Sequence, residues 1–127
     1  EENGHIGHGA VLHSCVVRRD ALVGMNAVVM DKAEIGAFSI VAACAFVPAG
    51  MQVPERSLVA GMPAKVKRAL TDAEVAWKLE GTLTYQDLTR RCLDTLKEVE
   101  PLQAIESGRP RVKFVDVKPL IETRRGG

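Results

Sequence analysis

The sequence predicts an all-β solenoid, a parallel β-helix of six-residue repeats, with a C-terminal α-helix. The first observation is a β-branched residue at every sixth position, at Val17, Val23, Val29, Ile35, Val41 and Val47. The second is a small residue four positions after each of the first five, at Ala21, Ala27, Ala33, Ser39 and Ala45. A helix of 3.6 residues per turn would spread such a repeat around its circumference, whereas a coil of short strands points the same position inward every time.

The composition agrees with a narrow interior. Of 127 residues, 46% are hydrophobic but only 4% are aromatic, and an interior of valine, isoleucine and alanine needs few rings. The formal net charge of +1 gives no reason to expect nucleic acid or a membrane surface as a partner. No apolar run approaches the roughly 20 residues of a membrane span. Three cysteines without paired spacing favour a reduced, cytoplasmic setting: Cys15, Cys44 and Cys92.

The β-helix is expected over residues 1–60, where it starts without the polar capping element that a solenoid end needs. We therefore expect N-terminal coils to be missing from this chain. The repeat also slips by one residue around His8 and His13, because Ile6 and Val17 are eleven positions apart. After Pro48 the repeat is expected to dissolve, since proline removes a donor from the strand ladder.

Residues 61–70 are expected to form a turn and connector, and residues 71–100 a helical segment. Thr71 followed by Glu74 is the capping-box pattern of a helix start. Gly81 is expected to interrupt the helix, and Pro101 to end it. An apolar stripe suits packing along the wall of the β-helix; it consists of Tyr85, Leu88, Cys92, Leu96 and Val99. Residues 101–127 are expected to form a mobile tail.

All three histidines of the chain, His5, His8 and His13, lie within its first thirteen residues. Neutral imidazole is the usual nitrogen ligand of zinc, and a catalytic zinc keeps three protein ligands with one open position for water. A single histidine is more often an exposed corner residue. Their clustering in a His-poor chain favours a functional site.

Three segments carry a resemblance to a known family: Gly7-His8 through Leu12-His13, Leu22-Val23-Gly24-Met25, and Gly61-Met62-Pro63-Ala64-Lys65. Over about residues 2 to 99 the chain resembles the γ-class carbonic anhydrase family of hexapeptide-repeat proteins, in the branch of phenylacetic acid degradation and carnitine operon proteins. The resemblance implies a left-handed β-helix and a homotrimer with metal between subunits. That metal is zinc or another divalent ion such as iron or cobalt.

By the same resemblance His8 and His13 are two of three metal ligands, and the third lies on an earlier coil that this sequence does not contain. His5 matches no metal position. The spacing of the two histidines agrees with a site between subunits. Five extended residues span roughly 16 Å, whereas two imidazoles on one zinc need bonds of about 2.1 Å. A neighbouring chain in a symmetric oligomer can supply the second imidazole.

Two further residues are candidates for a role in the site. Tyr85 is a candidate catalytic residue that could project into a neighbour's site, although packing explains the first residue of a helix stripe equally well. Lys65 lies in a segment similar to one of hexapeptide acyltransferases, where a lysine suits the phosphates of CoA. The segment is also explained as the turn that leads into the helix.

The resulting functional hypothesis is a zinc-dependent enzyme similar to γ-carbonic anhydrase. Zinc on imidazoles lowers the pKa of its water to about 7, which provides hydroxide for attack on carbon. The substrate is then a small molecule, either carbon dioxide or a CoA thioester of phenylacetate- or carnitine-type metabolism, so that the enzyme is carbonic anhydrase-like or a thioesterase. Two alternatives remain open. One is a hexapeptide acyltransferase that uses acetyl-CoA and a histidine base without metal, and the other is a non-catalytic trimeric scaffold.

Overall fold

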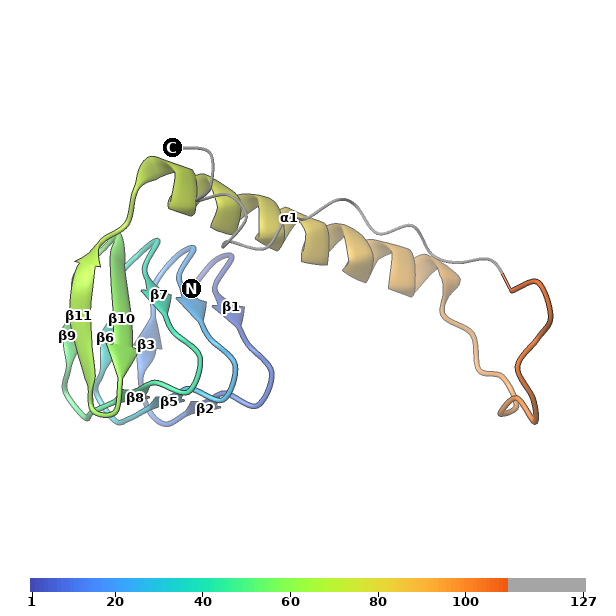
Figure 1. Ribbon diagram of the computed structural model, residues 1–127, viewed down its shortest axis with the longest axis horizontal. Coiled ribbons are helices and arrows are strands. Elements are labelled where there is room, and N and C mark those ends of the chain that lie inside the picture. Colours follow the sequence, from blue (N-terminus) through green and yellow to red (C-terminus); the bar gives the residue numbers. More distant parts are fainter. Residues whose placement is uncertain (110–127) are drawn as a thin grey trace. The chain divides into compact units, whose positions relative to one another are not determined.

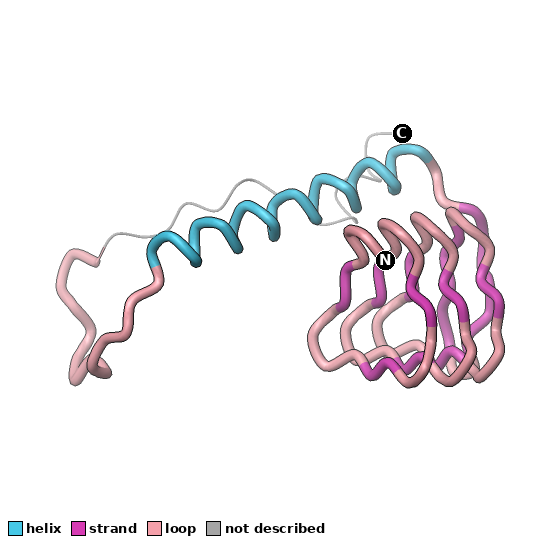
Figure 2. The backbone as a smooth tube through the Cα atoms, turned by 180° about the vertical axis from the view of Figure 1, so that it is seen from behind, coloured by secondary structure: helices cyan, strands magenta, loops and turns pink. Residues whose placement is uncertain are grey.

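The computed structural model describes residues 1–109 and divides the chain into two compact units, Glu1–Leu79 and Glu80–Gly127. The first unit contains the β-solenoid, as Figures 1 and 2 show. Its two-residue strands are β1 (His5–Ile6), β2 (Val11–Leu12), β3 (Val16–Val17), β4 (Leu22–Val23), β5 (Val28–Val29), β6 (Glu34–Ile35), β7 (Ile40–Val41), β8 (Phe46–Val47) and β9 (Gln52–Val53). Two longer strands follow, β10 (Ser57–Gly61) and β11 (Ala64–Ala69), and then the helix α1 (Asp72–Thr95).

The strands form three sides of a coil, and every third strand belongs to the same side. The side sheets have the orders β1-β4-β7-β10-β11, β2-β5-β8 and β3-β6-β9. All pairs are parallel except β10 with β11, which is antiparallel. A parallel β-helix with one C-terminal helix is therefore the architecture, as the repeat predicts.

The inward residues are those of the valine lattice. Val23, Val29, Ile35, Val41 and Val47 are fully buried, whereas Val17 in the first coil is half-buried against the same core. The small residues, Ala21, Ala27, Ala33, Ser39 and Ala45, are also buried, with at most 1% of their surface exposed. The predicted register is thus confirmed, and it places the alternate residues of each strand on the outer surface.

A left-handed backbone conformation occurs once in every repeat, a feature that the valine lattice did not reveal. Within the coil, the residues with φ between 48° and 73° are Asn3, Gly9, Ser14, Asp20, Asn26, Lys32, Phe38, Cys44, Gly50 and Arg56. The amides around each strand donate to the following coil, as from His13 N to the carbonyl of Val29 (2.9 Å). At the corner the left-handed residue donates backward instead, as from Lys32 N to the carbonyl of Ser14 (2.8 Å). This conformation therefore ties each corner to the preceding coil.

The one-residue slip lies in the corner between β2 and β3. Successive left-handed residues are six positions apart except Gly9 and Ser14, which are five apart. The pairing spacing changes accordingly, from 17 residues between Leu12 and Val29 to 18 residues between Val17 and Ile35. The short corner begins with His13, so the irregularity coincides with a candidate site residue.

The expectation that the repeat dissolves after Pro48 is wrong. Val53 and Val59 continue the inward series, with 5% and 0% of their surface exposed. Pro48 follows β8 and Pro54 follows β9, which are the last strands of their sheets. Because no later strand of those sheets needs their amides, proline costs no ladder bond there. The coil ends instead at the hairpin β10–β11, whose second strand occupies the expected connector.

The helix begins at the predicted capping box. Thr71 N donates to Glu74 Oε2 (3.0 Å), and Glu74 N donates to Thr71 Oγ1 (3.3 Å). Arg68 donates both terminal nitrogens to the Glu74 carboxylate, each at 2.7 Å. This bidentate pair joins β11 to the first turn of α1.

The expected interruption at Gly81 is also wrong, because α1 runs unbroken through it. A side chain at Gly81 would meet nothing within 4 Å, so the glycine carries only its propensity cost of about 1 kcal/mol. The helix ends at Thr95, before Pro101, where Leu96 is 82% exposed and has little packing to extend the helix. The expectation of a mobile tail falls largely on residues 110–127, which lie outside the described residues.

Inside the first unit, the start of α1 packs on the side formed by β1, β4, β7 and β10. Ile40, Leu70 and Val75 are buried there, against Leu22, Phe38, Leu58, Trp77 and Leu79. Lys78, 3% exposed, donates to the carbonyl of Asn3 (3.0 Å) and lies 3.7 Å from the buried carboxylate of Asp20. Burial lowers the pKa of Lys78, and the nearby carboxylate of Asp20 partly offsets this shift. Among residues 1–109, no helix is long and apolar enough to cross a membrane.

Candidate functional site

His8 and His13 lie on either side of β2. His8 belongs to the corner before the strand, His13 begins the corner after it, and both are exposed. Backbone bonds hold the two corners, since Asn26 N donates to the carbonyl of His8 (2.9 Å) and His13 N donates to the carbonyl of Val29 (2.9 Å). One strand therefore separates the imidazoles within a chain, as the five-residue spacing predicts.

The surface between the two histidines is apolar. The pairing places Val11, Val28 and Phe46 next to one another on the outside of β2, β5 and β8. Val11 is 53% exposed, and the other two are half-buried. We call these three residues the apolar face. His8 and His13 are at its two edges.

His13 is bonded to a carboxylate that the sequence did not identify. Its Nδ1 lies 2.9 Å from Oδ1 of Asp31, and both side chains are largely exposed. The hydrogen bond from His13 lowers the pKa of Asp31. The only signal in the sequence was position, because Asp31 is one coil after His13.

His5 has a different environment. It lies on β1, on the side that the start of α1 covers, and it is half-buried. Burial lowers the pKa of His5, and the charges of Lys78 and His8 lower it further. This histidine is therefore not at an edge of the apolar face, and its exclusion from the metal site stays a prediction.

The described part of one chain contains no complete metal site. Within residues 1–109, no group of three or more histidine, cysteine, aspartate or glutamate side chains is close enough to hold an ion. The two exposed imidazoles are suitable nitrogen donors, but they lie at opposite edges of the apolar face. Their pairing across two subunits stays a prediction.

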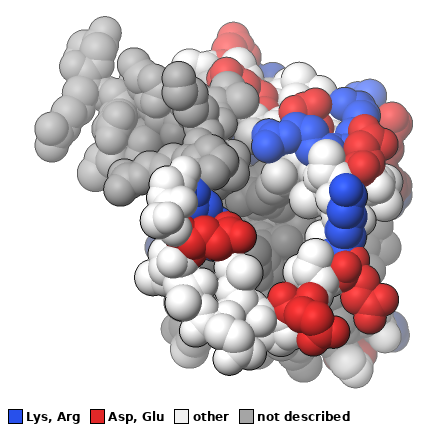
Figure 3. Space-filling view, turned by 90° about the vertical axis from the view of Figure 1, so that its right-hand side faces the viewer, with Lys and Arg blue, Asp and Glu red and all other residues white. Residues whose placement is uncertain are grey.

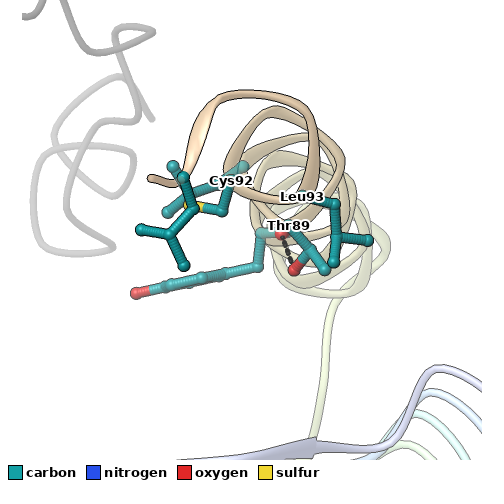
Figure 4. Close-up of a pocket in the computed structure, with 6 residues that line it drawn as sticks. Thr89, Cys92 and Leu93 are labelled. Atoms are coloured by element: carbon teal, nitrogen blue, oxygen red, sulfur yellow. Dashed lines mark hydrogen bonds between the residues drawn. The ribbon is translucent and has the colours of Figure 1, made fainter. Parts of the chain in front are cut away.

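Tyr85 belongs to the second unit and lies on α1, 52% exposed. It lines a pocket along the helix with Leu88, Thr89, Cys92, Leu93 and Leu96. Figure 4 shows this pocket, where Thr89 Oγ1 donates to the carbonyl of Tyr85 (2.9 Å). The stripe residues are exposed, with Tyr85 at 52% and Leu96 at 82%. Packing of the stripe and a catalytic role of Tyr85 therefore both stay predictions.

Lys65 lies on β11, next to the turn of the hairpin that contains the cis peptide Met62–Pro63, and its side chain is exposed. Lys67, two positions on, is exposed as well. Elsewhere charges of both signs are mixed, as Figure 3 shows for one face. Arg18, for example, contacts Glu1 at 2.6 Å and Glu34 at 2.8 Å.

The sequence is similar to curated proteins from bacterial carnitine operons. It is 59% identical over 119 residues to the carnitine operon protein CaiE of Salmonella agona (strain SL483), covering 93% of this chain and 60% of the relative. It is 54% identical over 120 residues to CaiE of Proteus sp. (strain LE138), covering 94% of this chain and 61% of that protein. The chain thus spans about three fifths of the length of these relatives. No protein-family model matches the sequence.

The fold is similar to solved structures of hexapeptide-repeat proteins. One, from Bacillus cereus and assigned as an acetyltransferase, has a TM-score of 0.71 and 34% identity over 72% of this chain and 53% of that one. A hexapeptide transferase family protein from Anaplasma phagocytophilum has a TM-score of 0.68 and 35% identity, covering 70% and 54%. A serine acetyltransferase from Brucella abortus strain S19, in complex with coenzyme A, has a TM-score of 0.51 and 26% identity, covering 56% and 31%.

The sequence relatives, the similar solved structures and the coil agree with one another. The resemblance to hexapeptide-repeat proteins of the carnitine operon branch is confirmed by the relatives and by the parallel β-helix itself. The similar solved structures are described as transferases, which favours the acyltransferase alternative over the carbonic anhydrase hypothesis. The chain is therefore similar in sequence to carnitine operon proteins and similar in fold to hexapeptide-repeat proteins.

Proposed function

We propose that the protein is a homotrimeric enzyme of the hexapeptide acyltransferase type, which uses a CoA thioester and His13 as general base. The observation that carries the proposal is the position of the two exposed histidines at opposite edges of the apolar face. The transferase descriptions of similar structures, and the coenzyme A in one of them, support the reaction class. The names of the relatives support a role in carnitine metabolism.

The apolar face supports the trimer. An outward valine that is 53% exposed, beside two half-buried apolar residues, is surface that a second copy can cover. If a three-fold axis places this face at each interface, the His8 edge of one chain approaches the His13 edge of the next. A site formed in this way occurs three times in the trimer.

The proposed reaction moves one acyl group and one proton. Nε2 of His13 takes the proton of an acceptor hydroxyl, whose oxygen forms a bond to the thioester carbonyl carbon. The carbon–sulfur bond breaks, and the CoA thiolate takes the proton from the imidazolium. The products are an acyl ester and the free CoA thiol. The exposed ammonium of Lys65 is proposed to contact the CoA phosphates.

The test measures CoA thiol release from acetyl-CoA with a thiol-reactive dye, with and without L-carnitine as a hydroxyl-bearing acceptor. His13→Ala should lower the rate by on the order of 10²-fold or more, as expected for loss of a general base. His5→Ala is the matched control and should retain the rate. No acetyl-CoA-dependent thiol release by the assembled protein would overturn the proposal and leave a metal-dependent hydratase or the non-catalytic scaffold.

A second candidate is a metal-dependent hydratase or thioesterase. It is supported by the same two imidazoles, because a neutral histidine from each of two chains can share one ion. His8 of one chain and His13 of the next would hold zinc, iron or cobalt, and the ion would supply Lewis-acid activation of water toward carbon dioxide or a thioester. The resemblance places a further ligand on an earlier coil that this sequence does not contain.

Metal analysis separates the two candidates. The trimer is reconstituted with zinc, iron or cobalt. If the metal-dependent candidate is right, His8→Ala and His13→Ala should each lose the ion, and His5→Ala should keep it. Mixed trimers of His8→Ala and His13→Ala subunits should then regain part of the metal, because some interfaces contain an intact His8 and an intact His13. A wild-type trimer that binds no metal would exclude this candidate and leave the acyltransferase proposal intact.

A further inference from the structure

The short corner after β2 determines which residue lies beside His13. His13 N donates to the carbonyl of Val29 (2.9 Å), and the carbonyl of Ser14 accepts from Lys32 N (2.8 Å). These two bonds tie the corner that begins at His13 to the corner of the next coil, which contains Asp31. Because the backbone is held on both sides, the carboxylate of Asp31 reaches the imidazole at 2.9 Å.

The contact distinguishes the two ring nitrogens of His13. A carboxylate is an acceptor, so Nδ1 donates its hydrogen to Oδ1 of Asp31. In the neutral ring the other nitrogen, Nε2, then carries the lone pair. A general base needs that lone pair, and so does a metal ligand.

The corner of His8 is different. Asn26 N donates to the carbonyl of His8 (2.9 Å), which places Met25 and Asn26 in the equivalent corner of the next coil. A thioether is a weak acceptor and an amide is neutral, so neither provides the charged acceptor that His13 has. The two histidines at the edges of the apolar face are therefore not equivalent.

We propose that Asp31 is the positioning residue of His13, which holds the imidazole with hydrogen on Nδ1 and presents the lone pair of Nε2 at the edge of the apolar face. This inference rests on the proposed function for its role in the reaction. The arrangement itself is a property of the chain and can be tested without any substrate. Loss of such a second partner of an active imidazole costs on the order of 10–100-fold in activity.

The test uses the ring nitrogens of selectively ¹⁵N-labelled histidine in the assembled protein, at a pH where the rings are neutral. Long-range ¹H–¹⁵N spectra report which nitrogen of each ring carries hydrogen. Wild type should show His13 with hydrogen on Nδ1. Asp31→Ala should convert it to the form with hydrogen on Nε2, whereas Asp31→Asn, which keeps an acceptor oxygen, should retain hydrogen on Nδ1.

Glu55→Ala is the matched control. Glu55 is an exposed acid that precedes a left-handed corner residue, as Asp31 does, and its loss should leave the spectrum of His13 unchanged. In the acetyl-CoA assay Asp31→Ala should lower kcat by about 10–100-fold with a smaller change in KM. Hydrogen on Nε2 in the wild type, or an unchanged form in Asp31→Ala, would overturn the inference. An inactive wild type with the expected spectra would overturn the proposed function alone.

Discussion

Replacement of Val29 by asparagine should be among the most destabilising single changes in the first unit. Val29 is fully buried between coils, and full burial of a valine contributes about 1.5–3 kcal/mol to stability. A buried amide without partners adds a cost of about 1–3 kcal/mol. The two effects together predict a loss of roughly 3–5 kcal/mol. For a unit of this size the melting temperature should therefore fall by more than about 10 °C.

Lys32→Asn is the matched control, three residues away in the same coil. Lys32 is exposed and has a φ of 56°, a conformation in which asparagine is several-fold enriched. The control should therefore change stability by less than about 0.5 kcal/mol. Both variants should be compared with wild type by thermal and urea unfolding, followed by far-UV circular dichroism at one protein concentration, because assembly shifts apparent stability. Equal melting temperatures for the two variants would refute the inward register of Val29.

Three further predictions follow from the same structure. Gly24→Ala should destabilise the coil, because a side chain there would lie 2.5 Å from the amide nitrogen of Ala43. Gly81→Ala, in open space on α1, should stabilise the protein by about 1 kcal/mol. Denaturant unfolding of both variants checks this prediction, and a stabilised Gly24→Ala would contradict it. His13 lowers the pKa of Asp31, so their contact should stabilise the fold above the ordinary carboxyl pKa of about 3.9. That stabilisation should be lost as the pH falls through the lowered pKa of Asp31 in the folded protein. In an NMR titration His13→Ala should raise the titration midpoint of Asp31, and an unchanged midpoint would disprove the contact. Lys78→Met should cost less than the roughly 3–5 kcal/mol of a broken buried pair, because Arg19 also lies 3.7 Å from the buried carboxylate of Asp20. Addition of Asp20→Asn should recover part of that loss in a double-mutant cycle, whereas purely additive losses would argue against the pair.

The inward side of the coil could be predicted because burial selects one kind of side chain. Every position of the valine lattice must fit the same narrow interior, so the residue type repeats with the structure. The left-handed corners impose a backbone conformation instead, and side chains as different as Phe38, Cys44 and Arg56 occupy them. Only the glycines and asparagines at spacings of about six, such as Asn3 and Gly9, hinted at these corners.

The prolines show how a local rule can mislead without topology. The expected end of the repeat after Pro48 rests on the rule that proline removes an amide from a strand ladder. Whether an amide is needed depends on a following strand, and β8 and β9 are the last of their sheets. Sequence periodicity was the better guide, since Val53 and Val59 continue the six-residue series across both prolines.

The candidate site was predicted in part. The position of His8 and His13 on either side of one strand follows directly from their spacing in a six-residue repeat. The contact of His13 with Asp31 does not, because it depends on which coil lies next and on a corner that is one residue short. A single repeat shows neither which coil lies next nor how long the corner is.

The five-residue repeat from Val11 to Cys15 shows how this architecture tolerates a deletion. Each coil contacts mainly its neighbours, so a missing residue is absorbed within one corner, and the strands on both sides keep their register, with Leu12 paired to Val29 and Val17 to Ile35. In a layered domain the same deletion would turn the rest of the strand over. Corner length in a solenoid is thus a variable separate from core packing, and it offers a way to move an edge residue such as His13 by a few ångströms while the hydrophobic interior stays unchanged.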